Sequence, residues 1–172
     1  LDPDHYTPAP PGELPGMDAA VATLRAAIAN GDPIRIWGDF DVDGQTASSV
    51  LLLGLRALGA TVDFTIPDRA THSHGLNPDG IRHAAADDVR VLLTCDCGVT
   101  DFDEIALARA QGLIVVISDH HDLAHGADGS VRKFERHRRR LLAGVDHLAA
   151  AHLVVFLVEV HKPGGQLQVG LR

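Results

Sequence analysis

Short apolar runs that alternate with helix-like segments are the feature that most constrains the fold of this chain. The apolar runs, each predicted to be a strand, span residues 34–37, 61–66, 91–94 and 113–117. Helices are predicted at residues 19–29, 46–58, 77–86 and 103–110. Strands that are apolar on both faces and separated by helices are typical of a parallel sheet covered on both sides. The predicted fold class is therefore α/β, a doubly wound, mainly parallel sheet with helices on both faces.

Local signals predict the ends and the buried faces of the first two helices. Asp18 is expected to cap the first helix, and Gly31 is expected to end it. In the second helix, the apolar face is predicted to consist of Val50, Leu53 and Leu58. We expect this face to pack on the sheet.

The length of 172 residues suits one domain with a sizeable core. Residues 1–16 are predicted to form a proline-rich arm, residues 17–125 the domain itself, and residues 126–172 an atypical C-terminal segment. This last segment holds a basic run at residues 129–140, which fits either a solvated helix face or phosphate contacts. The apolar element at residues 153–158 is predicted to be a strand rather than a buried helix.

Composition limits the partners and the compartment. Neither a signal peptide nor an apolar run long enough to span a bilayer is present, so we expect no membrane partner and a cytoplasmic location. Cys95 and Cys97 are expected to be buried thiols in a reducing compartment. The formal charge of -8 argues against a nucleic-acid partner unless bound metal ions offset the acids.

Acids and imidazoles follow three of the four predicted strands of the domain. In chain order they are Asp39, Asp41 and Asp43, then Asp96, then Asp119, His120 and His121. In doubly wound sheets the reactive crevice lies beyond the carboxyl ends of the strands. Carboxylates gathered there repel one another unless divalent cations bind between them, and imidazoles in the set favour Mn²⁺ over Mg²⁺. Two such ions can hold a phosphodiester and activate a water, so the pattern predicts a phosphoesterase.

Two alternative interpretations apply to the acidic run alone. An EF-hand calcium loop would need a glutamate at its twelfth position, and that position, counted from Asp39, is Val50. A solvated acidic turn is the other alternative. The position of Asp96 and His120 after neighbouring strands argues against it.

Four segments carry a resemblance to a known family. They are WGDFDVDGQTA at residues 37–47, IPDRATHSHGLN at 66–77, LLTCDCGVTD at 92–101 and SDHH at 118–121. In this order they resemble the motifs of the DHH phosphoesterases, and within that family they are most similar to RecJ-type single-strand-specific exonucleases. The resemblance covers roughly residues 1–123.

The resemblance implies an activity and a set of site residues. The activity is 5′-to-3′ hydrolysis of single-stranded DNA by a two-metal mechanism, in DNA repair and recombination. The implied metal ligands are Asp39, Asp41, Asp43, Asp96, which bridges the two ions, and His120. His121 would face the scissile phosphate, and Asp119 would orient an imidazole. Arg69 and His74 would approach the DNA strand, although a salt bridge that orders the loop is an alternative role for Arg69.

Other functions stay open at this point. The related manganese-dependent pyrophosphatases have a histidine where this chain has Trp37, which cannot ligate a metal. An oligonucleotide or cyclic-dinucleotide phosphodiesterase is the alternative enzyme. A catalytically silent binding fragment is the alternative from another class, because the fourth-motif aspartate and the second domain of RecJ-like proteins are not recognisable here. Asp146 and His147 follow His121 too closely to be assigned to that motif, and no oligomeric state is predicted.

Overall fold

A five-stranded sheet with strand order β2-β1-β3-β4-β5 forms the centre of the protein. The computed structural model describes residues 10–14, 16–121 and 154–158. The strands are β1 (Ile34–Gly38), β2 (Val62–Thr65), β3 (Val91–Cys95), β4 (Ile114–Asp119) and β5 (Val154–Val158). The first four pair in parallel, and β5 pairs antiparallel with β4. All five predicted strands are confirmed.

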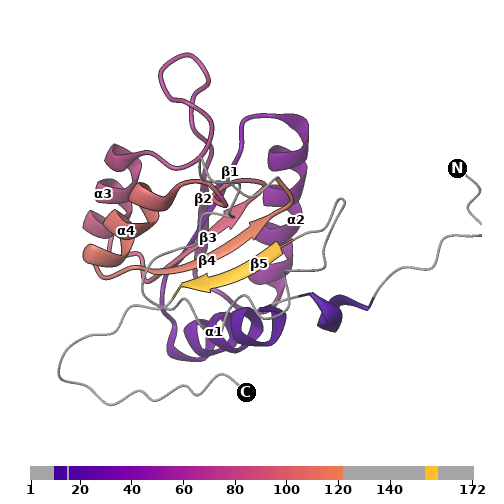
Figure 1. Ribbon diagram of the computed structural model, residues 1–172. Helices are drawn as coiled ribbons and strands as arrows, with labels where there is room; N and C mark the ends of the chain where they lie inside the picture. Colours follow the sequence, from indigo (N-terminus) through magenta and orange to yellow (C-terminus); the bar gives the residue numbers. More distant parts are fainter. Residues whose placement is uncertain (1–9, 15, 122–153, 159–172) are drawn as a thin grey trace, which may run out of the picture.

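Helices cover both faces of the sheet, as predicted (Figure 1). The helical elements are η2 (Pro11–Glu13), α1 (Met17–Asn30), α2 (Val42–Ala57), α3 (Pro78–Ala86) and α4 (Phe102–Ala110). Helices α1 and α2 share one apolar cluster with the sheet, and α3 and α4 share the other. The doubly wound α/β fold is therefore confirmed.

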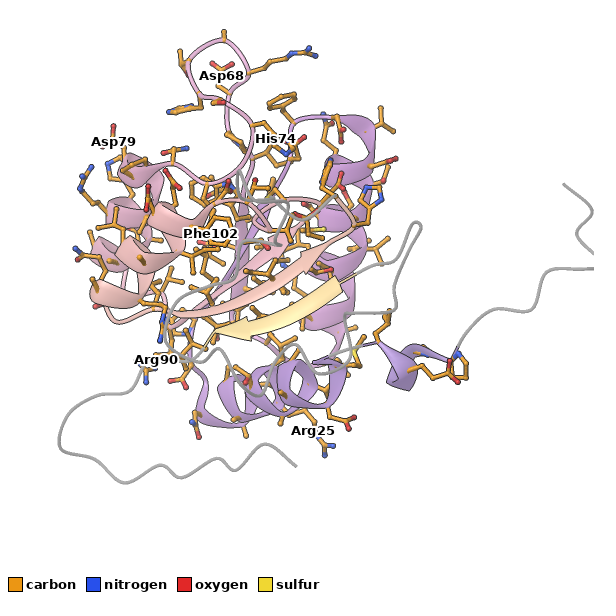
Figure 2. All side chains as sticks on the ribbon, viewed as in Figure 1. Arg25, Asp68, His74, Asp79, Arg90 and Phe102 are labelled. Carbon is orange, nitrogen blue, oxygen red and sulfur yellow. The ribbon has the colours of Figure 1, made fainter. Side chains whose placement is uncertain are left out.

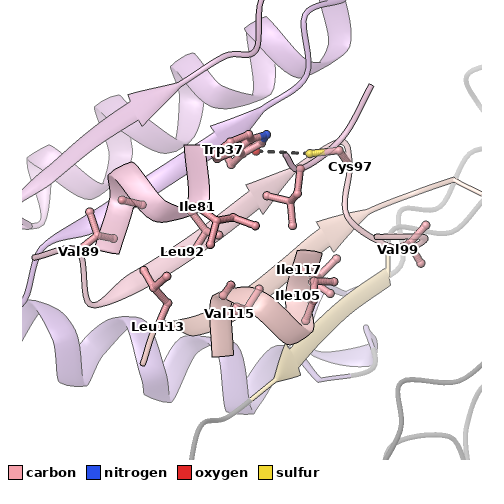
Figure 3. Close-up of a cluster of buried hydrophobic side chains, with 13 residues drawn as sticks. Trp37, Ile81, Val89, Leu92, Cys97, Val99, Ile105, Leu113, Val115 and Ile117 are labelled. Atoms are coloured by element: carbon pink, nitrogen blue, oxygen red, sulfur yellow. Dashed lines mark hydrogen bonds between the residues drawn. The ribbon is translucent and has the colours of Figure 1, made fainter. Parts of the chain in front are cut away.

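The two clusters exist because the central strands are apolar on both faces. In β3, Leu92 points into the cluster under α3 and α4, and its neighbours Val91 and Leu93 point into the cluster under α1 and α2. Figure 3 shows the first cluster, in which Leu92 packs beside Val115 and Ile117 of β4. Burial of one such side chain stabilises the fold by about 1.5–3 kcal/mol. The sheet thereby forms a rigid platform for the residues that follow its strands.

The predicted N-cap of α1, Asp18, is wrong, whereas the predicted end of α1 at Gly31 is confirmed. Gly16 with a φ of 78° precedes α1 and no side chain caps the helix, so Asp18 lies in the first turn instead. Its charge still favours that position, because the helix N-terminus carries partial positive charge. Asn77 caps α3 by accepting a hydrogen bond from the Gly80 amide at 2.8 Å. Gly31, with a φ of 72°, ends α1 as predicted.

The predicted apolar face of α2 is also wrong. Val50, Leu53 and Leu58 are 70%, 68% and 68% exposed. The buried side of α2 instead contains Gly44, Ser48 and Leu55. The helix begins at Val42, four residues earlier than expected. It packs on the sheet partly through small residues, which a prediction based on large apolar side chains does not detect.

Close packing between the start of α2 and the end of β1 explains why the side of α2 with small residues faces the sheet. A methyl group on Gly44 would lie 2.6 Å from the backbone nitrogen of Asp39, and one on Gly38 would collide with Ser48. Small residues at these positions allow the helix to turn directly after β1. This tight turn brings the start of α2 to the carboxyl edge of the sheet.

The strand order also determines where a ligand can bind. The chain leaves β1 toward β2 on one side and returns to β3 on the other side of β1. In such sheets the crevice lies at the carboxyl ends of the two strands where the order reverses. The loop between β2 and α3 rises above this edge (Figure 1). The site is therefore expected above β1 and β3.

Several predicted features lie outside the described residues. They are residues 1–9 of the proline-rich arm, the basic run at 129–140, Asp146 and His147. The proposed domain boundaries stay predictions for the same reason. Within the described part of the chain, no helix combines the length and the apolar character needed to cross a membrane.

Candidate metal centre

Asp39 is a buried carboxylate directly after β1. It is 2% exposed, and its Oδ2 lies 3.1 Å from Nδ1 of His74. Its Oδ1 is buried without a hydrogen-bond partner among the described residues. An unpartnered buried carboxylate oxygen is costly unless a cation or proton satisfies it. This atom therefore fits the edge of a cation site.

Asp96 occupies the equivalent position after β3. Its φ of 63° is in the left-handed region, which aspartate and asparagine tolerate better than other side chains. Its amide extends the sheet by donating to the Ser118 carbonyl at 2.9 Å. Burial raises the pKa of this carboxyl, and the negative charge of Asp41 raises it further. The site therefore concentrates negative charge that a bound cation would offset.

His120 and His121 complete a group of metal-type ligands with Asp96. One potential ligand atom from each of the three residues lies within 4.8 Å of the others. Nε2 of His120 is 2.9 Å from Oδ1 of Asp96. Neighbouring ligands of an octahedral divalent ion lie about 3 Å apart, so this separation suits two ligands of one ion. The sequence assigned His121 to the phosphate, and the structure places it in the same group as His120.

The buried carboxylate of Asp119 contacts both the amide and the ring of His121. It is 1% exposed, and its Oδ2 accepts a hydrogen bond from the Val99 amide at 2.9 Å. Its Oδ1 lies 3.1 Å from the His121 amide and 2.7 Å from Nδ1 of the His121 ring. This contact raises the pKa of His121. With Nδ1 occupied, His121 offers Nε2 to a metal or a phosphate.

The three acids of the first motif separate in the structure. Asp39 is buried, whereas Asp41 caps α2 by accepting from the Gly44 amide at 2.9 Å. Asp43 lies in the first turn of α2, exposed, and forms no hydrogen bond or ion pair with any described site residue. The chain is helical from Val42 onward, so alternate residues no longer share one face. The structure therefore brings Asp39 and Asp41 to the site and leaves Asp43 at its rim.

The two predicted DNA-contact residues have different surroundings. The Arg69 guanidinium lies 5.1 Å from the centroid of the Phe40 ring, a cation–π contact, and no salt bridge joins it to another described residue. His74 lies at the base of the loop whose tip carries Asp68, above the sheet edge (Figure 2). Its ring is 5.2 Å from that of His121. His74 therefore lies beside Asp39 and His121 at the candidate metal centre, a position that the sequence did not predict.

Three carboxylate–imidazole pairs thus meet at one edge of the sheet. They are Asp39 with His74, Asp96 with His120, and Asp119 with His121. Each acid is buried and each imidazole is more exposed. In the pairs of Asp39 with His74 and of Asp119 with His121, the carboxylate contacts Nδ1, an arrangement that is common around protein-bound metals. Asp96 and His120 instead offer two ligands to one ion.

Two further residues near the site were missed. Phe40 contacts both Arg69 and His74, with ring centroids of Phe40 and His74 6.1 Å apart. Asp101 accepts a hydrogen bond from the Leu76 amide at 2.7 Å. Asp101 ends the motif at residues 92–101, but an aspartate just before a helix is typical of an ordinary cap, so it was assigned no role of its own.

Without divalent metal, the protein is expected to become less stable as the pH rises from about 5 to about 8. Burial raises the pKa values of Asp96 and Asp101 above 3.8, and the hydrogen bond that the His121 ring donates to Asp119 raises the pKa of His121 above 6.5. The folded state then binds more protons than the unfolded chain, and stability is lost as the pH rises through the raised values. Thermal unfolding in EDTA should give a lower Tm at the higher pH. An unchanged or higher Tm would contradict this.

Comparison with known proteins places these motifs in a family. Residues 33–167 match the DHH family, N-terminal domain. The single-stranded-DNA-specific exonuclease RecJ of Bacillus subtilis is 38% identical over 121 residues, which are 70% of this chain and 15% of that protein. RecJ of Thermus thermophilus is 38% identical over 109 residues, 63% of this chain and 16% of that protein.

Solved structures show the same relationship. A crystal structure of exonuclease RecJ bound to manganese matches with a TM-score of 0.64 and 34% identity, over 69% of this chain and 31% of that one. RecJ from Thermus thermophilus in complex with Mn²⁺ matches with a TM-score of 0.57 and 28% identity, over 75% and 19%.

The chain spans only 15% and 16% of the length of these two curated relatives. The family match nevertheless covers most of the chain, and it includes the three strand ends on which the paired carboxylates lie. On this basis the chain belongs to the DHH family.

Proposed function

We propose that this chain hydrolyses phosphodiester bonds of single-stranded DNA from the 5′ end, as a metal-dependent exonuclease. The observation that carries the proposal is the set of three carboxylate–imidazole pairs at the carboxyl edge of the sheet. The relatives named as single-stranded-DNA-specific exonucleases support the choice of substrate. A cytoplasmic location and a role in DNA repair and recombination are part of the same proposal.

The described residues fit a divalent metal, with Mn²⁺ first and Mg²⁺ second. Asp96 and His120 are proposed to hold one ion, and Asp39 with Asp41 the other, with Asp43 at the rim. The unpartnered Oδ1 of Asp39 and the negative charge around Asp96 support this set. When bound, such ions lower the pKa of a water and neutralise charge on a phosphate.

The protein side chains have separate tasks in this proposal. Asp119 keeps Nδ1 of His121 hydrogen-bonded, so that Nε2 faces the scissile phosphate. Arg69, stacked on Phe40, is proposed to contact a phosphate of the strand. His74, held by Asp39, is proposed to contact the phosphate nearest the metal centre.

A binding-only fragment is the second candidate. The chain spans 15–20% of the length of the RecJ proteins that it matches, so most of the length of those proteins lies outside the matched region. Under this alternative the chain would bind Mn²⁺ or single-stranded DNA without hydrolysing it.

Hydrolysis of end-labelled DNA tests the proposal. With Mn²⁺, a 5′-labelled single strand should release labelled mononucleotide first, and a 3′-labelled strand should give a ladder. Double-stranded DNA, dinucleotides and pyrophosphate serve as competing substrates, and the Asp96→Asn variant purified in parallel controls for contaminating nucleases. Cleavage of dinucleotides or pyrophosphate alone would contradict the proposal. Binding of single-stranded DNA without hydrolysis would favour the binding-only fragment.

A further inference from the structure

Asp101 stands at the N-cap position of α4 but does not cap that helix. An aspartate in this position ordinarily accepts from an amide of the first turn, which stabilises a helix by about 0.5–2 kcal/mol. In α4 no side-chain cap is formed. Oδ2 of Asp101 instead accepts from the amide of Leu76, 25 residues earlier, at 2.7 Å. The Asp101 side chain therefore binds the loop that precedes α3 and not the first turn of α4.

The peptide group between Gly75 and Leu76 also forms a hydrogen bond with Trp37. Nε1 of Trp37 donates to the Gly75 carbonyl at 3.2 Å, and the ring is fully buried. The Gly75 carbonyl and the Leu76 amide belong to one planar peptide group. Trp37 therefore hydrogen-bonds to the carbonyl of this group, and Asp101 hydrogen-bonds to its amide. Gly75 has a φ of 85°, and a side chain there would collide with the Asp101 carboxylate. We call this arrangement the peptide clamp.

The peptide clamp lies directly after His74. The residues from Asp68 to His74 are all exposed, so little burial holds this part of the loop. His74 nevertheless has Nδ1 3.1 Å from Asp39 and its ring 5.2 Å from that of His121. In Figure 2, His74 lies at the base of this loop. Gly75 and Leu76, which the clamp holds, are the first buried residues of the chain after His74.

The position of Asp101 costs stability in two ways. The residue gives up its own helix cap, and burial raises the pKa of its carboxyl, which shows that desolvation disfavours the charged form. Its hydrogen bond from Leu76 opposes that shift. Costs of this kind are typical of residues that serve a site rather than the core.

We propose that Asp101 is a positioning residue, which together with Trp37 holds the Gly75–Leu76 peptide so that His74 stays on Asp39. Nδ1 of His74 is then occupied, and Nε2 is the nitrogen that contacts a substrate phosphate. The role of Nε2 rests on the proposed function, whereas the peptide clamp itself does not.

Imidazole NMR of the metal-free full chain tests the peptide clamp without any activity. Long-range ¹H–¹⁵N spectra report which ring nitrogen carries the hydrogen and whether it is hydrogen-bonded, and His74→Gln identifies the His74 signals. In Asp101→Ala these signals should shift to those of a solvent-exposed imidazole, while His121 keeps its tautomer and its Nδ1 hydrogen bond to Asp119. Asp101→Asn, which keeps an acceptor for the Leu76 amide, should retain the wild-type pattern. Asp103→Ala, an exposed acid in the same helix, is the matched control.

Two NMR results would overturn the peptide clamp. Unchanged His74 signals in Asp101→Ala would show that the carboxylate does not position this ring. Equal changes at His74 and His121 would show a general structural role for Asp101 instead.

Kinetics then test the consequence for the substrate. Asp101→Ala and His74→Gln should each lower kcat/KM on single-stranded DNA by roughly 10-fold, the loss expected for one hydrogen bond to a charged group. The double variant should be no slower than His74→Gln alone, and Asp101→Asn should restore activity. Additive losses would contradict a shared role. If the wild-type chain does not cleave DNA, the proposed function fails, and the NMR result still decides the peptide clamp.

Discussion

The Asp96→Asn variant is expected to lose at least about 100-fold in Mn²⁺ affinity while it keeps the wild-type fold. Changes to groups that only orient metal ligands cost roughly 10- to 100-fold, and Asp96 supplies a ligand itself. Asparagine has the same shape but no charge, and it tolerates the φ of 63° that the chain adopts here. Titration of free Mn²⁺ by electron paramagnetic resonance measures the affinity, and thermal unfolding in EDTA measures the fold.

Asp88 offers a matched control for this variant. It has a φ of 58° and is exposed before β3, at the opposite end of that strand. Asp88→Asn should leave Mn²⁺ affinity unchanged. Asp96→Ala should lose the metal as Asp96→Asn does and should also be less stable, because alanine in the left-handed region costs about 1–2 kcal/mol. Wild-type Mn²⁺ affinity in Asp96→Asn would disprove the assigned ligand.

The Asp119→Ala variant is expected to lose about 2–4 kcal/mol of stability and roughly 10- to 100-fold in Mn²⁺ affinity. The buried Val99 amide would lose its acceptor, and each unsatisfied buried donor costs about 1–3 kcal/mol. The partly exposed His121 can replace its lost contacts with water, so its main change is a ring that is no longer oriented. Urea unfolding in EDTA measures the first effect, and Mn²⁺ titration measures the second.

Asp79→Ala is the control for the stability effect. Its carboxylate pairs with Arg82 on the surface of α3, at 2.7 Å and 80% exposed, so its loss should cost less than about 1 kcal/mol. Asp119→Asn should retain more stability than Asp119→Ala, since one oxygen can still accept from Val99. An Asp119→Ala protein as stable as Asp79→Ala, with full Mn²⁺ affinity, would refute the proposed support of His121.

The order of strands and helices could be predicted because burial patterns are local. β3 and β4 are apolar on both faces, and that pattern alone requires cover on both sides of the sheet. The face of α2 could not be predicted in this way. Its contact with β1 depends on how closely Gly44 approaches Asp39, and the larger side chains of Val50 and Leu53 are left exposed.

The candidate site, like the fold, could be predicted only in part. The acids and imidazoles after β1, β3 and β4 were expected together, because parallel strands end at one edge. The outward position of Asp43 was not expected, since it follows from a helix that starts at Val42. The place of His74 beside Asp39 and His121 was not expected either, because it depends on the path of a loop.

The α/β fold, the edge of the sheet that carries the site, and the acids and imidazoles gathered there could all be predicted from the sequence. These follow from side-chain periodicity and from residues that adjoin strand ends, which are properties of short segments. The pairing of each carboxylate with its imidazole became visible only in the folded protein. The same is true of Asp101, which accepts a hydrogen bond from the Leu76 amide instead of capping its own helix. The contacts of Asp39 with His74, of Asp96 with His120 and of Asp101 with Leu76 join distant parts of the chain. They depend on how loops close over the sheet, and no local pattern encodes that.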